Sequence, residues 1–420
     1  MERDKIYYAL EDQQKDFVLD EFTINREAID KISLLRKAKM PIIIYGVRRC
    51  GKSYLMKILK NKLNLKEKEF LFINFNDERL AGFKIEDFQK INDFLIEKRY
   101  SNNCYLFLDE IQETEKWEKW IDRIKEKYPI FITGSNSRIL SGEIATILTG
   151  RTLKINLTPF NFKEYLKAKS VSIKDWKYDL NKHSFLRQAF KNYLINGGIP
   201  KRVLINLRSI IIELYEDILY KDIIARVGQE NLREIKELGN YFLSNPSSYT
   251  TLRALSEFSK IKNLGTLRKI LTSFENSFLF FFISKFDNSF KKQTRNPKKI
   301  YCIDNGFISH IGFRVSEDYG KLLENFVAIE LKRRGHEIYY YSDKKECDFV
   351  IRKNNKIIDA IQVCYMINEE NKEREYSGLI EAMEKFKLKD GTILTYDLEE
   401  KIKIKGKQIR IIPVWKWLLE

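Results

Sequence analysis

The chain has 420 residues and a mass of 50.1 kDa, which is too long for one ordinary core and predicts two to four domains. Hydrophobic residues make up 44% and charged residues 32%, a composition that excludes a disordered chain. The net charge of +17 is concentrated in residues 151–320, where 29 basic residues stand against 16 acidic ones. This excess indicates either a local surface for a polyanion or solvated lysines spread over an ordinary surface.

The first strong signal is a strand, a glycine-containing loop and a helical pattern in succession. Residues 41–45 are apolar and rich in isoleucine, as in a buried parallel strand, and lead into GVRRCGKS at 46–53 and a helix over 54–63. The match to GxxxxGK[ST] in this context predicts a phosphate-binding loop for ATP. Lys52 would reach the β- and γ-phosphates, and the Ser53 hydroxyl would bind Mg²⁺. The expected nucleotide-binding residues are Gly46, Val47, Arg48, Arg49, Cys50, Gly51, Lys52, Ser53 and Tyr54.

A second apolar strand, residues 104–108, ends in an acid pair. We expect Asp109 to hold Mg²⁺ through its water shell and Glu110 to orient and polarise the attacking water. The site should lie at the carboxyl ends of the strands. Two acids in sequence, rather than one, favour hydrolysis over binding alone.

Two further apolar runs, residues 70–75 and 130–133, are expected in the same sheet. The second precedes GSNS, where Asn136, or alternatively Ser135, would contact the γ-phosphate or the water. Between residues 117 and 124 two tryptophans and two isoleucines recur at helical spacing, which predicts a helix covering the sheet.

The basic middle of the chain is helical in pattern over 160–235, broken at Gly197-Gly198. Short helices are then predicted over 232–243, 249–258 and 263–274, with Thr250 or Thr251 as an N-cap. A β-like stretch follows, made of 278–285, 290–295 and 300–303. This order is typical of a winged helix with a basic wing. We therefore expect residues 250–300 to contact DNA, largely without sequence preference, although many winged helices pack on proteins.

The motifs together resemble a widespread AAA+-type ATPase family of archaea and bacteria. The resemblance is carried by GVRRCGKS, YLFLDEIQ, FITGSNS, LTGR at 148–151 and LTPFNFKEYL at 157–166, and continues in residues 193–200 and 219–226. It implies a helical lid after the ATPase core. It also makes Arg151 a candidate arginine finger acting on a neighbouring subunit, or a sensor within the same one, and so allows a homo-oligomer.

The C-terminal part resembles the PD-(D/E)xK nuclease fold that often ends members of this ATPase family. The predicted order is a helix over 322–334, strands over 337–341, 346–351 and 357–363, a helix over 375–386 and a strand over 391–396. The resemblance matches Glu324 and Asp348 to the motif but places Gln362 at the second acid and Cys364 at the lysine. A neutral amide is a poor Mg²⁺ ligand and a thiol supplies no ammonium, so we expect an inactive nuclease fold used for binding or assembly.

Three features of the sequence indicate where in the cell the protein is expected: its cysteines, its histidines and its apolar runs. The five cysteines are dispersed without a CxxC pair, which is typical of reduced thiols, and the three histidines share no ligand spacing with them. The charged start of the chain lacks a signal-peptide pattern, and the longest apolar run, 277–284, is far shorter than a bilayer span. We expect a cytoplasmic protein with no membrane partner.

The predicted fold class is α/β, with a P-loop NTPase parallel sheet of AAA+/ASCE type. The expected domains are the ATPase core at 1–160, a helical lid at 161–235, a winged helix at 236–314 and the nuclease-like domain at 315–420. The leading hypothesis is an ATPase that binds DNA or assembles through its other domains. The alternatives are an ATP-dependent switch without hydrolysis and, less favoured, an active nuclease.

Overall fold

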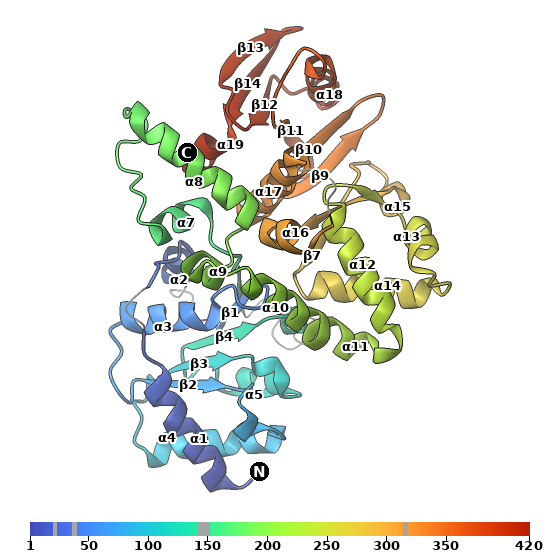
Figure 1. Ribbon diagram of the computed structural model, residues 1–420. Coiled ribbons are helices and arrows are strands. Elements are labelled where there is room, and N and C mark those ends of the chain that lie inside the picture. Colours follow the sequence, from blue (N-terminus) through green and yellow to red (C-terminus); the bar gives the residue numbers. More distant parts are fainter. Residues whose placement is uncertain (20–22, 36–39, 141–151, 314–317) are drawn as a thin grey trace. The chain divides into compact units, whose positions relative to one another are not determined.

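A computed structural model describes residues 1–19, 23–35, 40–140, 152–313 and 318–420 (Figure 1). Their contacts divide them into two compact units. Unit 1 comprises Met1–Thr158 and Asn276–Phe278, and unit 2 comprises Pro159–Glu275 and Leu279–Glu420. Within the described ranges, no helix is both long enough and apolar enough to cross a bilayer.

Unit 1 is built on a five-stranded sheet in which every pairing is parallel. The strand order is β2-β3-β4-β1-β5. The strands are β1 (Ile42–Tyr45), β2 (Phe70–Asn74), β3 (Tyr105–Asp109), β4 (Ile130–Gly134) and β5 (Leu153–Asn156). Because all strands run in one direction, the carboxyl ends of β1, β3 and β4 meet at the same edge, where ligands of such sheets bind.

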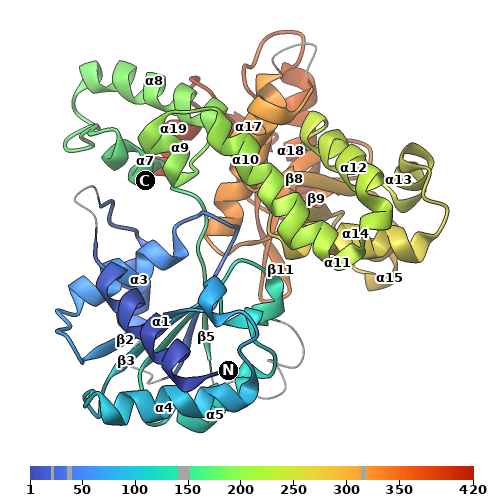
Figure 2. The same ribbon diagram turned by 60° about the horizontal axis from the view of Figure 1, so that its bottom comes forward.

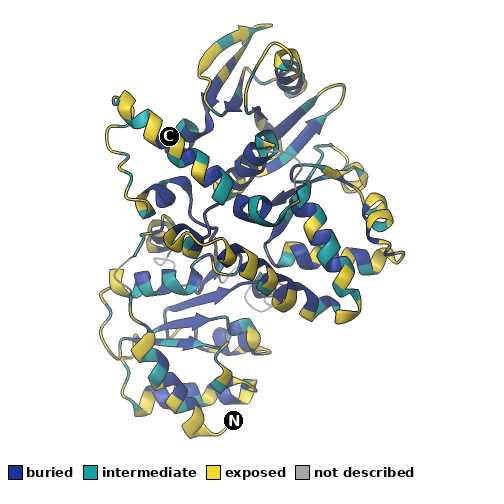
Figure 3. Cartoon of the chain, viewed as in Figure 1, coloured by how far each residue is buried: buried dark blue, intermediate teal, exposed yellow. Residues whose placement is uncertain are grey.

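Helices cover both faces of this sheet. Alternate strand residues on one face join a core with α1 (Arg3–Asp16), α4 (Phe88–Glu97) and α5 (Trp117–Ile124). Here α4 and α5 lie side by side (Figure 2), and the rings of Phe88 and Trp120 stack with centroids 4.4 Å apart. Two further helices, α2 (Ala28–Leu35) and α3 (Lys52–Lys62), contact β5 and β4. Strands β1, β2, β3 and β4 are therefore buried almost throughout (Figure 3), which explains their continuous apolar runs.

The structure confirms the four strands and the covering helix that were expected in unit 1. Helix α1 and the edge strand β5 were not predicted. Strand β5 has only four residues, and its sequence LKIN has half of them exposed, so no apolar run marks it.

Unit 2 begins with helices, as the pattern over 160–235 predicted. They are α7 (Phe162–Ala168), α8 (Leu180–Asn196), α9 (Pro200–Ile205), α10 (Ser209–Asp217) and α11 (Ala225–Val227). Between α10 and α11 the chain stays helical but widens into a π-helical segment, Ile218–Ile224. This segment contains most of the 219–226 motif.

The next part of unit 2, which we call the small module, combines three helices, and a short fourth helix described below, with a three-stranded antiparallel sheet. In chain order it contains α12 (Leu232–Ser244), β6 (Tyr249–Thr250), α13 (Leu252–Ser259), α14 (Leu264–Asn276), β7 (Phe280–Ser284) and β8 (Lys298–Cys302). The strand order is β6-β8-β7. Thr251 is the N-cap of α13, and its hydroxyl accepts a hydrogen bond from the Ala254 N–H.

One prediction in this module is wrong. Residues 290–295 were expected to be β-like, but they form a short helix, α15 (Phe290–Arg295). None of its residues is buried, and no neighbouring strand supplies hydrogen-bond partners, so the lysines and glutamine of FKKQTR adopt the helical turn that they favour.

The C-terminal part of unit 2 is a six-stranded mixed sheet in the order β13-β14-β12-β11-β10-β9. A short helix, α16 (Asn305–Ile311), precedes it. Its other elements are α17 (Tyr319–Arg333), β9 (Glu337–Ser342), β10 (Glu346–Lys353), β11 (Lys356–Val363), α18 (Lys372–Lys385), β12 (Asp390–Thr395), β13 (Glu400–Ile404), β14 (Lys407–Pro413) and α19 (Val414–Leu419). The elements expected over 322–396 are confirmed. The last three were not predicted.

Candidate active site

The loop after β1 has the backbone that an anion-binding turn requires. Gly46 and Gly51 have φ values of +154° and +99°, in the region that favours glycine. A Cβ atom at Gly46 would lie 2.0 Å from the carbonyl oxygen of Leu157. Helix α3 starts directly after the loop, at Lys52, so its N-terminal N–H groups face the same space.

Lys52 is buried beneath this loop. Its ammonium donates hydrogen bonds to the carbonyl oxygens of Gly46 at 3.1 Å and Val47 at 3.2 Å. It also lies 3.8 Å from a carboxylate oxygen of Glu110. The cation is therefore held where the loop curls, next to the acid pair of β3.

Ser53 and Asp109, the two expected magnesium ligands, are in direct contact. The Ser53 hydroxyl donates to Asp109 Oδ2 at 2.7 Å, and the Thr133 hydroxyl donates to Asp109 Oδ1. Burial, and then the charge of Glu110, raise the pKa of Asp109 above its ordinary value. The hard oxygen donors of Ser53 and Asp109 fit Mg²⁺, which prefers such ligands together with phosphate oxygens and water.

Glu110 is fixed by its neighbours in an uncommon backbone conformation, with φ +52° and ψ +40°. Its Oε2 accepts hydrogen bonds from the Ser135 N–H at 3.0 Å, from the Ser135 hydroxyl at 2.9 Å and from the Gln112 amide. Burial opposes ionisation of Glu110, but the Lys52 charge and these hydrogen bonds outweigh it and lower the pKa. These surroundings favour the ionised form of Glu110 and fix the position of its carboxylate.

The other expected residues take different positions. Val47 and Cys50 are buried, and burial raises the pKa of the Cys50 thiol, so both side chains support the loop from below. Arg49 is exposed, whereas Arg48 and Tyr54 are half-buried. Asn136 is buried one residue beyond Ser135, and the Ser135 hydroxyl contacts Glu110. Arg151 lies outside the described residues.

Three residues that support this site were not predicted. Thr133 bonds Asp109 through its hydroxyl and accepts from the Glu110 N–H at 3.1 Å, and Gln112 contacts Glu110. The buried guanidinium of Arg26 donates to the carbonyl oxygens of Cys50 at 2.8 Å and Thr158 at 2.6 Å. A polar residue at the end of an apolar strand is the only sequence signal that marks Thr133.

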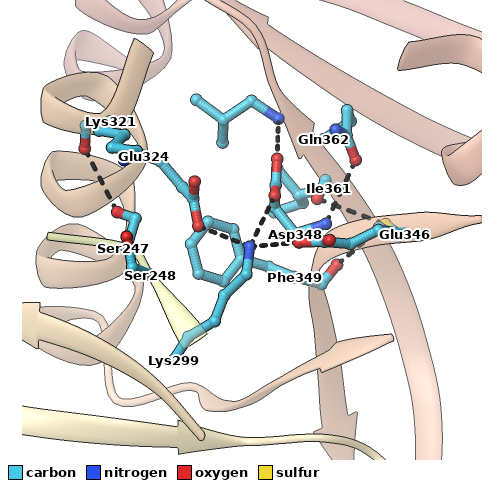
Figure 4. Close-up of polar contacts among 12 residues, drawn as sticks. Ser247, Ser248, Lys299, Lys321, Glu324, Glu346, Asp348, Phe349, Ile361 and Gln362 are labelled. Carbon is cyan, nitrogen blue, oxygen red and sulfur yellow. Dashed lines mark hydrogen bonds and ion pairs between the residues drawn. The ribbon is translucent and has the colours of Figure 1, made fainter. Parts of the chain in front are cut away.

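Unit 2 contains a second polar cluster, at the residues compared with the nuclease motif (Figure 4). Glu324 on α17 and Asp348 on β10 lie close together, with Glu346 beside them, and we call these three residues the acidic cluster. The Lys299 ammonium of β8 lies 2.9 Å from Glu324 Oε1, 2.5 Å from Glu346 Oε1 and 3.1 Å from Asp348 Oδ1. Cys364 supplies no ammonium, but Lys299, which was not predicted here, brings one to the acidic cluster from strand β8.

Gln362 and Cys364 do not join the acidic cluster through their side chains. The Gln362 amide accepts from the Asp348 N–H at 3.2 Å and donates to Glu375 at 2.8 Å. The Cys364 thiol donates to the Met366 carbonyl at 3.2 Å. In the described ranges no three acidic, histidine or cysteine side chains are arranged to hold a metal ion.

Comparison with known proteins agrees with the architecture of unit 1. Residues 38–166 match the family model of an AAA domain. Residues 187–317 and 319–417 match two domains of unknown function, DUF8612 and DUF4143. A parallel five-stranded sheet with a P-loop, matched by an AAA domain, defines unit 1 as a P-loop ATPase domain of AAA-like type.

Two relatives cover nearly the whole chain. An uncharacterised protein of Methanocaldococcus jannaschii, MJ1544, is 36% identical over 397 residues, which are 90% of this chain and 88% of the relative. An uncharacterised protein of Haemophilus influenzae is 30% identical over 393 residues, or 90% and 94%. The chain belongs to the family of these two proteins. Among solved structures, the Walker-type ATPase paby2304 of Pyrococcus abyssi is similar, with 13% identity, a TM-score of 0.40, and coverage of 70% of this chain and 97% of that one.

Proposed function

We propose that the protein binds ATP with Mg²⁺ at the loop 46–53 and hydrolyses it. The proposal is supported above all by one observation: Ser53 contacts Asp109, while the adjacent Glu110 lies next to Lys52 and is held by Ser135. Different side chains at one edge of the sheet would thus bind the phosphates, the magnesium ion and the attacking water.

Each side chain has a distinct task in this mechanism. The loop N–H groups and Lys52 bind the phosphates and offset negative charge as it shifts to the leaving group. Ser53 and Asp109 would hold Mg²⁺, which neutralises phosphate charge when bound. Glu110 orients water for in-line attack on the γ-phosphate, and Ser135 keeps the carboxylate in place.

Two substitutions separate binding from turnover. We expect Lys52→Ala to lose most ATP affinity, because the phosphates lose their buried cation. We expect Glu110→Gln to keep ATP affinity but to lower the hydrolysis rate by about 10²–10³-fold, since an amide cannot polarise the water. Nucleotide titration and phosphate release measure the two effects.

Glu115→Gln is the matched control, because Glu115 is exposed a few residues further along. If wild type and Glu110→Gln bind ATP equally and neither releases phosphate above background, the protein is a nucleotide-dependent switch and the hydrolysis proposal fails.

We further propose that the small module binds DNA. Its order of elements is that of a winged helix, in which α14 would enter the major groove. A groove of about 660 Å³ lies between α13, α14 and α15. Its lining holds four cations and a single carboxylate: Arg253, Arg268, Arg295, Lys298 and Glu275. This balance favours phosphate contacts.

DNA affinity measured against salt tests this proposal. We expect Arg268→Ala with Lys298→Ala to weaken duplex binding and to reduce the slope of log K against log salt by about 2, roughly one per lost phosphate contact. Lys403→Ala, on exposed β13 of the same unit, should leave both unchanged. No measurable duplex affinity at low salt would contradict DNA binding and leave the ATPase proposal intact.

A further inference from the structure

The side chain of Lys299 is buried, and its ammonium contacts the three carboxylates of the acidic cluster. We propose that the Lys299 ammonium is the resident cation of the acidic cluster. With the ammonium in place the three carboxylates are not arranged to hold a metal ion; Lys299 itself supplies the positive charge between them, and it holds strand β8 of the small module against α17 and β10.

The buried negative charges of the acidic cluster require a positive charge beside them. Glu324 and Asp348 are largely buried, and carboxylates are buried at acceptable cost only when they are paired and hydrogen-bonded. Lys299 is the cation that contacts all three members of the acidic cluster.

Other groups of the protein also donate hydrogen bonds to the carboxylates of the acidic cluster. Tyr301 donates its hydroxyl proton to Glu324 Oε1 at 2.7 Å. The Val363 N–H donates to Asp348 Oδ2 at 3.0 Å. The side-chain amide of Gln362 is engaged with Glu375 and the Asp348 backbone. With Lys299 in place, the oxygen atoms of Glu324 and Asp348 nearest the centre already have partners.

Strand β8 provides an internal control for this role. Successive side chains of a strand point to opposite faces. Lys298 accordingly lines the groove between α13, α14 and α15, whereas Lys299 points into the acidic cluster. The two lysines are adjacent, identical in chemistry and different in surroundings, so paired substitutions separate the effect of the cluster from that of losing a positive charge.

The test is thermal unfolding and Mn²⁺ binding of the full chain without nucleotide. In EDTA, Lys299→Met should lower the Tm by on the order of 10 °C, because a buried charge group loses its partner, and Lys298→Met should change it little. Adding Mn²⁺ should restore at least half of the loss. Lys299→Met should also bind one more Mn²⁺ per chain than wild type, measured by the loss of the free Mn²⁺ electron-paramagnetic-resonance signal.

A second variant checks that the new ion lies in the acidic cluster. Lys299→Met combined with Asp348→Asn should lose the additional Mn²⁺. Lys299→Arg keeps the positive charge, so its Tm, like that of wild type, should be the same in EDTA and in Mn²⁺. If Lys299→Met does not fold in EDTA, it should fold in Mn²⁺.

Several results would overturn the proposal. One is a Lys299→Met protein that is as stable as Lys298→Met in EDTA, or that fails to fold in Mn²⁺ as well. Another is wild type binding as much Mn²⁺ as Lys299→Met. Cleavage of DNA by wild type with Mn²⁺ that Lys299→Met abolishes would instead make Lys299 a catalytic residue.

Discussion

At the scale of single residues, the two adjacent carboxylates that end β3 have opposite electrostatic surroundings. Burial, and then the negative charge of Glu110, raise the pKa of Asp109, although the hydroxyl groups that contact it act in the opposite direction. Glu110 faces Lys52 and the donors of Gln112 and Ser135, so its pKa is lowered. A magnesium ion at Asp109 would reverse the first effect, because a nearby divalent charge favours the carboxylate.

Another buried carboxylate, Asp304, makes stability depend on pH. It accepts hydrogen bonds from the N–H groups of Gly198 at 2.6 Å and Gly306 at 2.8 Å. Burial raises its pKa to about 6, although these hydrogen bonds and the charges of Arg333 and Arg202 act in the opposite direction.

The direction in which stability changes with pH follows from proton binding. Between about pH 4 and 6 the folded protein keeps the Asp304 proton while the unfolded chain releases it, so this residue's contribution to stability falls as pH rises through that window. From pH 4 to 7 wild type should lose on the order of 3 kcal/mol relative to Asp304→Asn. Urea unfolding across pH measures the difference, with Asp390→Asn at the exposed start of β12 as control. A difference that stays constant with pH would contradict the prediction.

At the scale of elements, the conformation of the loop 46–53 requires the backbone at Gly46 to lie close to the backbone at Leu157. We expect Gly46→Ala to lower ATP affinity at least 10-fold, because its Cβ would collide with the Leu157 carbonyl oxygen and φ is +154°. Gly265→Ala is the control, since Gly265 lies in α14 and only the Asn263 amide oxygen is near. Fluorescent-nucleotide titration with a Tm for each variant checks this. Unchanged affinity in a folded Gly46→Ala protein would show that the loop adapts.

The sequence predicted those elements whose signals are local. The strand, loop and helix around Lys52 follow from periodicity and glycine spacing, and the meeting of Ser53 with Asp109 follows from parallel strands. The contacts of Thr133 and Ser135 depend on the register between β3 and β4, which residue types alone do not fix. Lys299 was missed because it lies 25 residues from Glu324 and 49 from Asp348, on a strand of another module, with no motif at its own position.

At the scale of the whole molecule, the role expected for Arg151 would connect the ATP site to assembly. We expect Arg151→Ala to slow ATP turnover by about 10³-fold, as loss of an arginine finger does. If Arg151 acts on a neighbouring subunit, mixing Arg151→Ala with Lys52→Ala should restore part of the turnover, because one pairing of subunits has both residues intact. Phosphate release from the mixture measures this. Two inactive proteins that stay inactive together would place Arg151 in its own subunit's site.

The widened helix at Ile218–Ile224 has a consequence for chain length. A π turn closes a hydrogen bond over five residues instead of four, so it accommodates one amino acid more than an α turn does. Tyr220 and Lys221 are exposed there, while Ile223 and Ile224 are buried. Deleting one exposed position would let the segment return to regular α geometry and would leave the helix beyond it nearly in place, whereas the same deletion in a regular α-helix would turn everything beyond it by about 100° around the axis. The bulge therefore accommodates an additional residue while the residues beyond it, Arg226 among them, keep their places on the helix.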